Sequence, residues 1–159
     1  MKLEGAAIAG YQTVSITGIR DPHVLAHTGT WTKTLHDFLT DGISRILGLT
    51  TDDYRLELRC YGWNAVLGDL DPDHETPPRE VGVGLIATAP TQDVATTIAK
   101  YSNPYLLHMP LPGETHMPSY AFMSSPAEMP RGVVHEFVLQ HAVQLDDPAE
   151  LVRIEMSDL

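Results

Sequence analysis

The order in which two kinds of hydrophobic periodicity alternate along the chain is the strongest constraint on its fold. Residues 11–19, 54–61, 80–88 and 133–143 alternate apolar and polar side chains or are rich in Val, Ile and Thr, which predicts strands. Residues 31–47 and 91–101 repeat apolar side chains at helical spacing, which predicts helices. This order is the split βαβ pattern, so we predict an α+β, ferredoxin-like βαββαβ sandwich with both helices on one face.

Local signals support the first strand and helix. In the first strand, Val14 and Ile16 point to one face, and the intervening Thr and Ser side chains point to the other. Thr30 is the expected N-cap of the first helix, and Gly48 stands where a left-handed residue ends it. Gly42 inside that helix is expected to cost about 1 kcal/mol relative to Ala.

Two connections are longer than this fold requires. Residues 62–79 join the two middle strands, and residues 104–130 precede the last core strand. The second connection holds six of the twelve prolines and four of the six methionines. Because proline restricts the backbone, we expect 104–130 to be an ordered insertion loop. Residues 1–159 are expected to form one domain.

The composition excludes several classes of function. A formal net charge of −11 opposes binding to nucleic acid or to anionic membranes. No apolar run approaches the roughly 20 residues of a membrane-spanning helix, and the N-terminus lacks the apolar core of a signal peptide. Cys60 is the only cysteine, so an intramolecular disulfide is impossible. We therefore expect a cytoplasmic protein with neither a nucleic-acid nor a membrane partner.

The later histidines raise the question of a metal site. His108, His116, His135 and His141 follow one another in the second half of the chain, and Glu114 or Asp146 could join them. His135 and His141 share a strand face with Phe137 and Leu139. No HxH or HExxH pair occurs, so we predict no metal and no cofactor, and separate hydrogen-bonding roles for these histidines.

Three other motifs have an ordinary structural interpretation. Ser124-Ser125-Pro126 lacks the flanking glycines of a nucleophile elbow and is expected to form a turn or cap. Gly82-Val83-Gly84 lies inside a predicted strand, unlike a dinucleotide-binding loop. Cys60 falls on the apolar face of its strand, so we expect a core residue and not a reactive thiol.

Two polar segments offer better candidates for binding. Arg20 and Asp21 follow the first strand, where the Arg can bind a carboxylate or phosphate through two hydrogen bonds. Alternatively, Arg20 and Asp21 form a structural pair that caps the next turn. Residues 61–68 combine Tyr61, Trp63 and Asn64 with two glycines, which suits either a binding wall with one oriented amide or an ordered loop.

These segments resemble the acyclic terpene utilisation (AtuA-like) family. The similarity consists of these ordered matches: Gly18-Ile19-Arg20-Asp21-Pro22; Tyr61-Gly62 with Asn64-Ala65-Val66-Leu67-Gly68; Leu107-His108 with Pro110 and Pro112-Gly113; Ala121-Phe122 with Ser125-Pro126; Glu136-Phe137 with His141; and Asp146-Asp147-Pro148. They span about residues 10–154. The family has Pro where this chain has Met123. In that family a large N-terminal domain is followed by a ferredoxin-fold region like this chain.

The resemblance implies a role in the breakdown of branched acyl-CoA or hydroxy acids. We expect the small subunit of a two-chain lyase or hydratase/dehydratase that acts on a carboxylate or acyl substrate, with a separate large AtuA-like subunit as partner. Arg20, Asp21, Asn64 and Ser125 are the expected substrate-binding residues, and His108 or His141 the expected catalytic residue. The alternative is a non-catalytic binding or assembly module, whose open sheet face forms a homo-oligomer. Both alternatives predict an oligomer.

Overall fold

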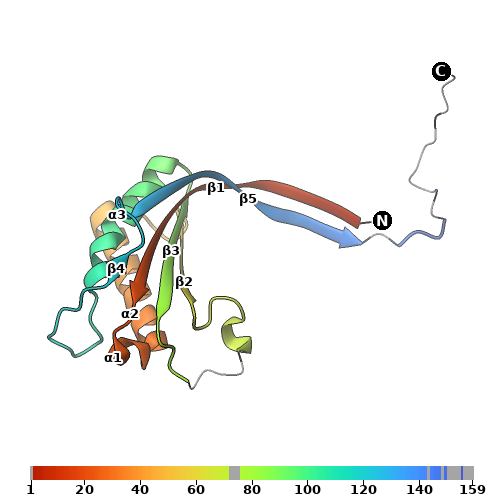
Figure 1. Cartoon of the computed structure of the whole chain (residues 1–159). Helices are drawn as coiled ribbons and strands as arrows, with labels where there is room; N and C mark the ends of the chain where they lie inside the picture. The colour runs from red at the N-terminus through yellow and green to blue at the C-terminus, as the bar shows by residue number, and fades with distance from the viewer. Residues whose placement is uncertain (1, 72–75, 143, 148, 150–154, 156–159) are drawn as a thin grey trace. The chain divides into compact units, whose positions relative to one another are not determined.

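The computed structural model describes residues 2–71, 76–142, 144–147, 149 and 155. The sequence also predicts a last short element at 148–156, after Asp146-Asp147, and this segment falls almost entirely outside these residues. The chain divides into two compact units. Residues 10–134 form the first unit, here called the body. Residues 1–9 with 135–159 form the second unit. Its strand residues, 2–9 and 135–142, are here called the ribbon. Strands β1 (Lys2–Ile19) and β5 (Glu128–Ala142) contribute residues to both units (Figure 1).

The body contains an antiparallel sheet. Its strands run in the order β2-β3-β1-β4, and β5 also pairs with β1. Strand β2 is Arg55–Tyr61, β3 is Val81–Ala89 and β4 is Ala121–Phe122. Ala87 of β3 lies between Thr13 of β1 and Leu56 of β2, which fixes the register of the three strands. The mixed α+β architecture agrees with the sequence prediction, although the last part of the chain supplies two strands instead of one.

Strands β1 and β5 are both longer than predicted. Strand β1 begins at Lys2 instead of residue 11, and β5 begins at Glu128 instead of residue 133. The added part of β1 consists mainly of Ala and Gly, which have low strand propensity. Pairing between β1 and β5 overrides this local preference, because ladder hydrogen bonds depend on the neighbouring strand and not on the side chain.

The helices lie on one face of the body sheet (Figure 1). They are α1 (Pro22–Leu25), α2 (Thr28–Gly42) with the π-turn η1 (Ile43–Leu47), and α3 (Gln92–His108). The 3₁₀ turn η2 (Gly68–Leu70) lies in the connection between β2 and β3. Gly48 has a φ of 69° and ends the π-turn as predicted. Thr30 is not the N-cap, because α2 begins at Thr28 and His27 holds the capping position without a side-chain bond.

Helix α3 continues seven residues past its predicted end at Tyr101. Pro104 lies inside it and removes one backbone donor, yet Leu106 beyond the proline is fully buried in the core. Burial of this apolar face outweighs the missing hydrogen bond. The non-helical excursion is therefore 109–127, shorter than the expected 104–130, and its Leu111 and Tyr120 pack into the core.

The central strand β1 presents polar side chains to the helices. Thr13, Ser15 and Thr17 are fully buried, whereas Val14 and Ile16 lie half-buried on the opposite face. The neighbouring strands instead turn apolar side chains inward. The shared core is formed by Trp31, Leu35, Leu39 and Ile43 from α2 and η1, Leu56 and Cys60 from β2, Val81, Val83, Leu85 and Ala87 from β3, and Ala95, Ile98, Ala99 and Leu106 from α3.

Gln92 at the start of α3 connects this polar row to the rest of the body. Its Nε2 donates to the Thr13 Oγ1 at 2.7 Å and to the Gln12 carbonyl at 3.1 Å. Its Oε1 accepts from the Gly132 N–H at 2.9 Å, and Thr13 and Thr96 hydroxyls lie 3.0 Å apart beside it. The Gln92 side chain of α3 thus forms hydrogen bonds with both β1 and β5.

The opposite face of the body sheet carries a row of charges on its edge strand. Glu57 accepts from Arg59 Nη2 at 2.7 Å and lies 3.1 Å from Arg55 Nε. Beside this row, Gly82 of β3 lies between Gly18 of β1 and Tyr61 of β2, so β1 and β3 contribute few side-chain atoms at this end of the face. Helices α1, α2 and α3 do not cover this face (Figure 1).

Replacing Gln92 tests the polar connection. In Gln92→Leu, the Gly132 N–H and the Thr13 hydroxyl lose a partner in a partly buried setting, so we expect a loss of about 1–2 kcal/mol in the free energy of unfolding. Urea denaturation measures it. Gln12→Leu is the matched control, because the Gln12 amide makes one long contact, 3.3 Å to Thr88. Equal losses in the two variants would contradict the role of Gln92.

Gly42 is explained by packing and not by helix propensity. A Cβ at this position would overlap the Tyr101 hydroxyl oxygen and lie 2.9 Å from Tyr101 Cζ. Gly42→Ala therefore gains about 1 kcal/mol in helix propensity but is expected to lose about 1–3 kcal/mol through overpacking. Thermal unfolding should show net destabilisation, with part of it recovered in Gly42→Ala/Tyr101→Phe. The exposed neighbour variant Asp41→Ala should stay within about 0.5 kcal/mol; a stabilised Gly42→Ala would refute the packing explanation.

Candidate functional site

Three adjoining pockets surround α1 and the first turn of α2. They share lining residues: Leu25, Pro77 and Pro78 belong to the first and second, and His27 and Thr30 belong to the second and third. Strand β1 ends directly before α1, so the pockets lie where the chain leaves the sheet. Loops from residues 76–79 and 111–114 complete their walls.

The first pocket contains two arginines. Arg20 and Arg79 line a depression of about 420 Å³ together with Pro22, Leu25 and the Pro77-Pro78 pair. The side chain of Arg20 is 80% exposed, and its Nη1 is 4.0 Å from Glu80 Oε2, so this ion pair is weak. Guanidinium groups beside an apolar wall suit a ligand that has an anionic group and a hydrocarbon part.

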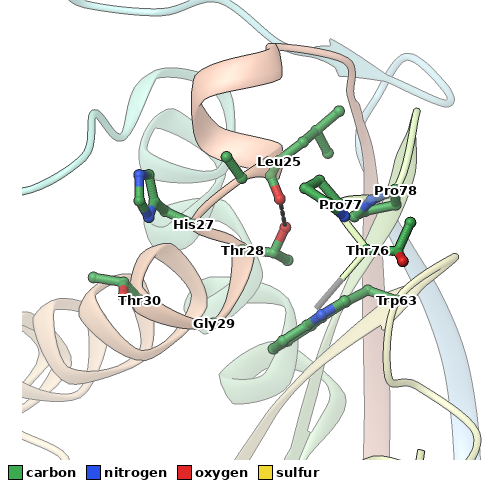
Figure 2. A pocket seen from close by; sticks show the side chains of 10 residues that line it. Leu25, His27, Thr28, Gly29, Thr30, Trp63, Thr76, Pro77 and Pro78 are labelled. Atoms are coloured by element: carbon green, nitrogen blue, oxygen red, sulfur yellow. Dashed lines mark hydrogen bonds between the residues drawn. The ribbon is translucent and has the colours of Figure 1, made fainter. Parts of the chain in front are cut away.

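The second pocket lies at the N-terminus of α2 (Figure 2). Trp63 forms one wall, and a Cβ on Gly29 would lie 3.1 Å from Trp63 Cη2, so glycine permits this close approach. Thr28 is buried and its hydroxyl donates to the Leu25 carbonyl at 2.9 Å, which joins α1 to α2. The first N–H groups of a helix carry partial positive charge, so this wall is compatible with an anion.

The third pocket contains a histidine–carboxylate pair. His23 Nε2 is 2.6 Å from Glu114 Oε1, and the His27 ring meets the His23 ring edge to face at 5.6 Å between centroids. Leu111, Pro112 and Gly113 form the rest of the wall, and the volume is about 350 Å³. A carboxylate bonded to one ring nitrogen orients the imidazole, an arrangement that serves proton transfer.

Tyr120 is buried beside Trp31 of α2. Its hydroxyl donates to the Met109 carbonyl at 3.0 Å, and Trp31 Nε1 donates to the same oxygen at 2.8 Å. Burial raises the pKa of Tyr120 well above its usual range, and the negative charges of Asp21 and Glu114 raise that pKa further. Tyr120 therefore remains a neutral hydrogen-bond donor that fixes the 109–120 segment against α2.

Of the substrate-binding residues predicted from the 18–22 and 61–68 segments, Arg20 lines the first pocket, and Trp63 of the second segment forms a wall of the second pocket. Asp21 is the N-cap of α1, and its Oδ1 accepts from the His23 N–H at 2.8 Å and the Val24 N–H at 3.3 Å. The capping alternative therefore describes its contacts. Asn64 is half-buried and contributes its carbonyl oxygen to the Gly68 N–H at 2.9 Å, within the loop after β2.

The predicted catalytic histidines are not among the lining residues of these pockets. His108 ends α3, its Nδ1 donates to the Pro118 carbonyl at 2.8 Å, and it lines a separate depression with Phe122 and Glu128. Ser125 is exposed, beside a cis bond to Pro126. His141 is exposed on β5 in the ribbon, which belongs to the second compact unit.

Sequence reasoning missed His23, His27 and Arg79, and it considered Glu114 only as a possible metal ligand beside the later histidines. The spacing of four residues between His23 and His27 was a signal, because residues at this spacing face the same side of a helix. In the structure, His23 lies in α1 and His27 holds the capping position of α2. Glu114 and Arg79 gave no comparable signal, since each reaches the site from a distant loop. Cys60 is a core residue, as predicted: it is 1% exposed, burial raises its thiol pKa, and Thr32 Oγ1 lies 3.3 Å from its sulfur.

Within the described part of the chain, no three His, Cys, Asp or Glu side chains are grouped closely enough to hold a metal ion. Likewise, none of the described helices is both long and apolar enough to cross a bilayer. No family model matches the chain, and comparisons with curated proteins and with solved structures find no match. The resemblance to the AtuA-like family therefore depends on the motifs quoted above.

The role of Asp21 can be separated into capping and charge. Asp21→Ala removes both hydrogen bonds to the start of α1, so we expect a loss of about 1 kcal/mol in unfolding free energy. Asp21→Asn retains an acceptor oxygen and is expected to stay close to the unmodified protein, as Asn and Asp cap about equally. Urea denaturation of both variants measures the difference. A loss in Asp21→Asn as large as that in Asp21→Ala would show that charge, and not capping, is what matters.

Proposed function

We propose that this chain binds the anionic group of a carboxylate or acyl substrate as the small subunit of a two-chain lyase or hydratase/dehydratase. The observation that carries the proposal is the first pocket, where Arg20 and Arg79 stand beside an apolar wall of three prolines and Leu25. The guanidinium groups bind the carboxylate or phosphate, and the wall packs against the hydrocarbon part. No cofactor enters this proposal.

Proton transfer is assigned to His23 in preference to His108 and His141. Pro22 lines the Arg20 pocket and is followed directly by His23, whose imidazole is oriented by Glu114. In a dehydration, a base removes a proton from carbon and an acid protonates the departing hydroxyl group, which leaves as water. His23 is suited to one of these two transfers, and the large subunit supplies the other.

The partner in this proposal is a large AtuA-like chain. The support is the quoted motifs together with an antiparallel sheet in the order β2-β3-β1-β4, which is compatible with a ferredoxin-like fold whose last strand is divided into β4 and β5. The Arg20 side of the first pocket is open to solvent, so a second chain can close it. Closure by a partner would exclude water and strengthen the Arg–anion interaction.

A second candidate function is a non-catalytic assembly module that forms a homo-oligomer. It is favoured by the ribbon, where Ile8, Phe137 and Val138 are each more than half exposed. Such a module needs no ligand in the Arg20 pocket. Ligand binding at that pocket therefore discriminates between the two candidates.

Titration with hydroxy acids and with short acyl-CoA esters, followed by calorimetry or amide NMR shifts, tests the binding proposal. Arg20→Ala and Arg79→Ala should each weaken binding about tenfold, which corresponds to about 1.4 kcal/mol for a charge-assisted contact. Arg55→Ala is the matched control, because it removes the same charge from the edge strand on the open face of the sheet. Equal weakening in all three variants would reveal a general charge effect and contradict a specific pocket.

The enzymatic part needs its own test with the assembled complex. The large chain, sought as the product of a neighbouring gene, should co-purify with this chain and produce activity. In that complex His23→Gln should reduce kcat at least about a hundredfold with little change in KM, as expected for loss of a general acid or base. His108→Gln should retain activity. The opposite pattern would overturn the assignment to His23 while leaving the binding proposal intact.

A further inference from the structure

The ribbon exposes large apolar side chains to solvent. Leu3 and Ile8 of β1 are 41% and 67% exposed, and Phe137, Val138 and Leu139 of β5 are 75%, 62% and 48% exposed. A two-stranded ribbon is at best marginally stable in water, and consecutive large apolar residues on it indicate a contact surface.

The two faces of the ribbon differ in chemistry. A Cβ on Gly5 would lie 3.3 Å from Leu139 Cβ, which shows that Gly5 and Leu139 share one face. By strand alternation, the first face then carries Leu3, Gly5 and Ala7 from β1 and Phe137 and Leu139 from β5. The second face carries the intervening residues.

The charges of the ribbon lie on the second face. Among the described strand residues 2–9 and 135–142, the acidic and basic side chains are Lys2, Glu4 and Glu136, all at even positions. Lys2 and Glu4 form an ion pair there. The first face has no Asp, Glu, Lys or Arg within those residues, and its titratable groups are His135 and His141.

The first face is complementary in shape to itself. The β5 half carries the two large side chains, Phe137 and Leu139, and the β1 half carries the two small residues, Gly5 and Ala7. A two-fold axis brings the same patch of both partners together, and an axis parallel to the strands places each half of one ribbon over the other half of its partner. Phe137 and Leu139 of one copy would then fill the low surface above Gly5 and Ala7 of the other.

We propose that the ribbon is a self-association surface, through which two copies of this chain pack first face against first face. The lack of charge on this face supports a second copy as the occupant. Two chains that each carry a formal net charge of −11 repel one another, and they approach at least cost where the surface is uncharged. The surface lies outside the body pockets, so the inference is independent of the proposed ligand binding; it deepens the second candidate function, the assembly module.

The size of the surface sets the strength of the contact. Eight residues per strand give a length of about 26 Å, and a face two strands wide buries less than the roughly 1,200–2,000 Å² of a standard stable interface. We therefore expect association that depends on concentration, with exchange between monomer and dimer. Contacts of this kind depend strongly on single large side chains, which makes Phe137 the decisive residue.

Sedimentation velocity over a range of protein concentrations tests the proposal. The unmodified chain should shift from its mass of 17.5 kDa towards twice that mass as concentration rises. Phe137→Glu should abolish the shift, and Val138→Glu, a neighbour of similar exposure on the second face, should retain it. On β1, Ala7→Glu and Ala6→Glu form a second matched pair with the same expected contrast. Near-ultraviolet circular dichroism from Trp31 and Trp63 in the body reports whether each variant is folded.

Three outcomes would overturn the proposal. A chain that stays at 17.5 kDa at every concentration does not self-associate. Equal loss of association in Phe137→Glu and Val138→Glu would mean that the first face is not the contact. Ribbon amide NMR signals that shift only on addition of a different protein, and not with concentration, would show that the surface belongs to another partner.

Discussion

The hydrogen bonds of Gln92 are the interaction on which the arrangement of the body depends. The inward face of the central strand is polar, so it cannot be placed against α3 by apolar packing alone. Gln92 donates to Thr13 and to the Gln12 carbonyl and accepts from Gly132, which satisfies groups from two strands at once. A one-residue slip of β1 would separate these partners and turn Val14 inward instead of Thr13. The buried polar contacts thus specify one register, whereas the apolar residues of β3 supply most of the buried surface.

The pockets are a consequence of where β1 ends. Once β1 is fixed against β3 and α3, the chain must leave the sheet after Ile19, and Asp21 caps the short helix that begins there. Arg20 and His23 are only three residues apart in sequence. The cap at Asp21 and the turn of α1 nevertheless direct them to different pockets. Prolines in the 76–79 and 111–114 loops restrict the backbone of the facing walls, which limits the conformational entropy lost when a ligand binds.

Glycines with positive φ stand where the strands of the body approach the ribbon. Gly10 has a φ of 132°, and a Cβ there would lie 2.7 Å from the Ala89 carbonyl oxygen. Gly132 has a φ of 75° and donates its N–H to Gln92. Both conformations are unfavourable for residues with a Cβ. The hydrogen-bonded region that sets the register of the body therefore includes two positions that favour glycine.

Local periodicity was enough to predict the strands near residues 54–61 and 80–88, the apolar stripe of α2, the end at Gly48 and the burial of Cys60. These features depend on side chains close in sequence. The sequence could also show that Val14 and Thr13 point to opposite faces of β1, but it could not show that the polar face is the buried one. That choice depends on Gln92 and Thr96, about 80 residues away. The pairs His23–Glu114 and Arg20–Arg79 likewise come from distant loops, and the ribbon exists because β1 and β5 pair over residues of low strand propensity. A pattern within one segment determines which side chains share a face; only contacts between segments decide what that face meets.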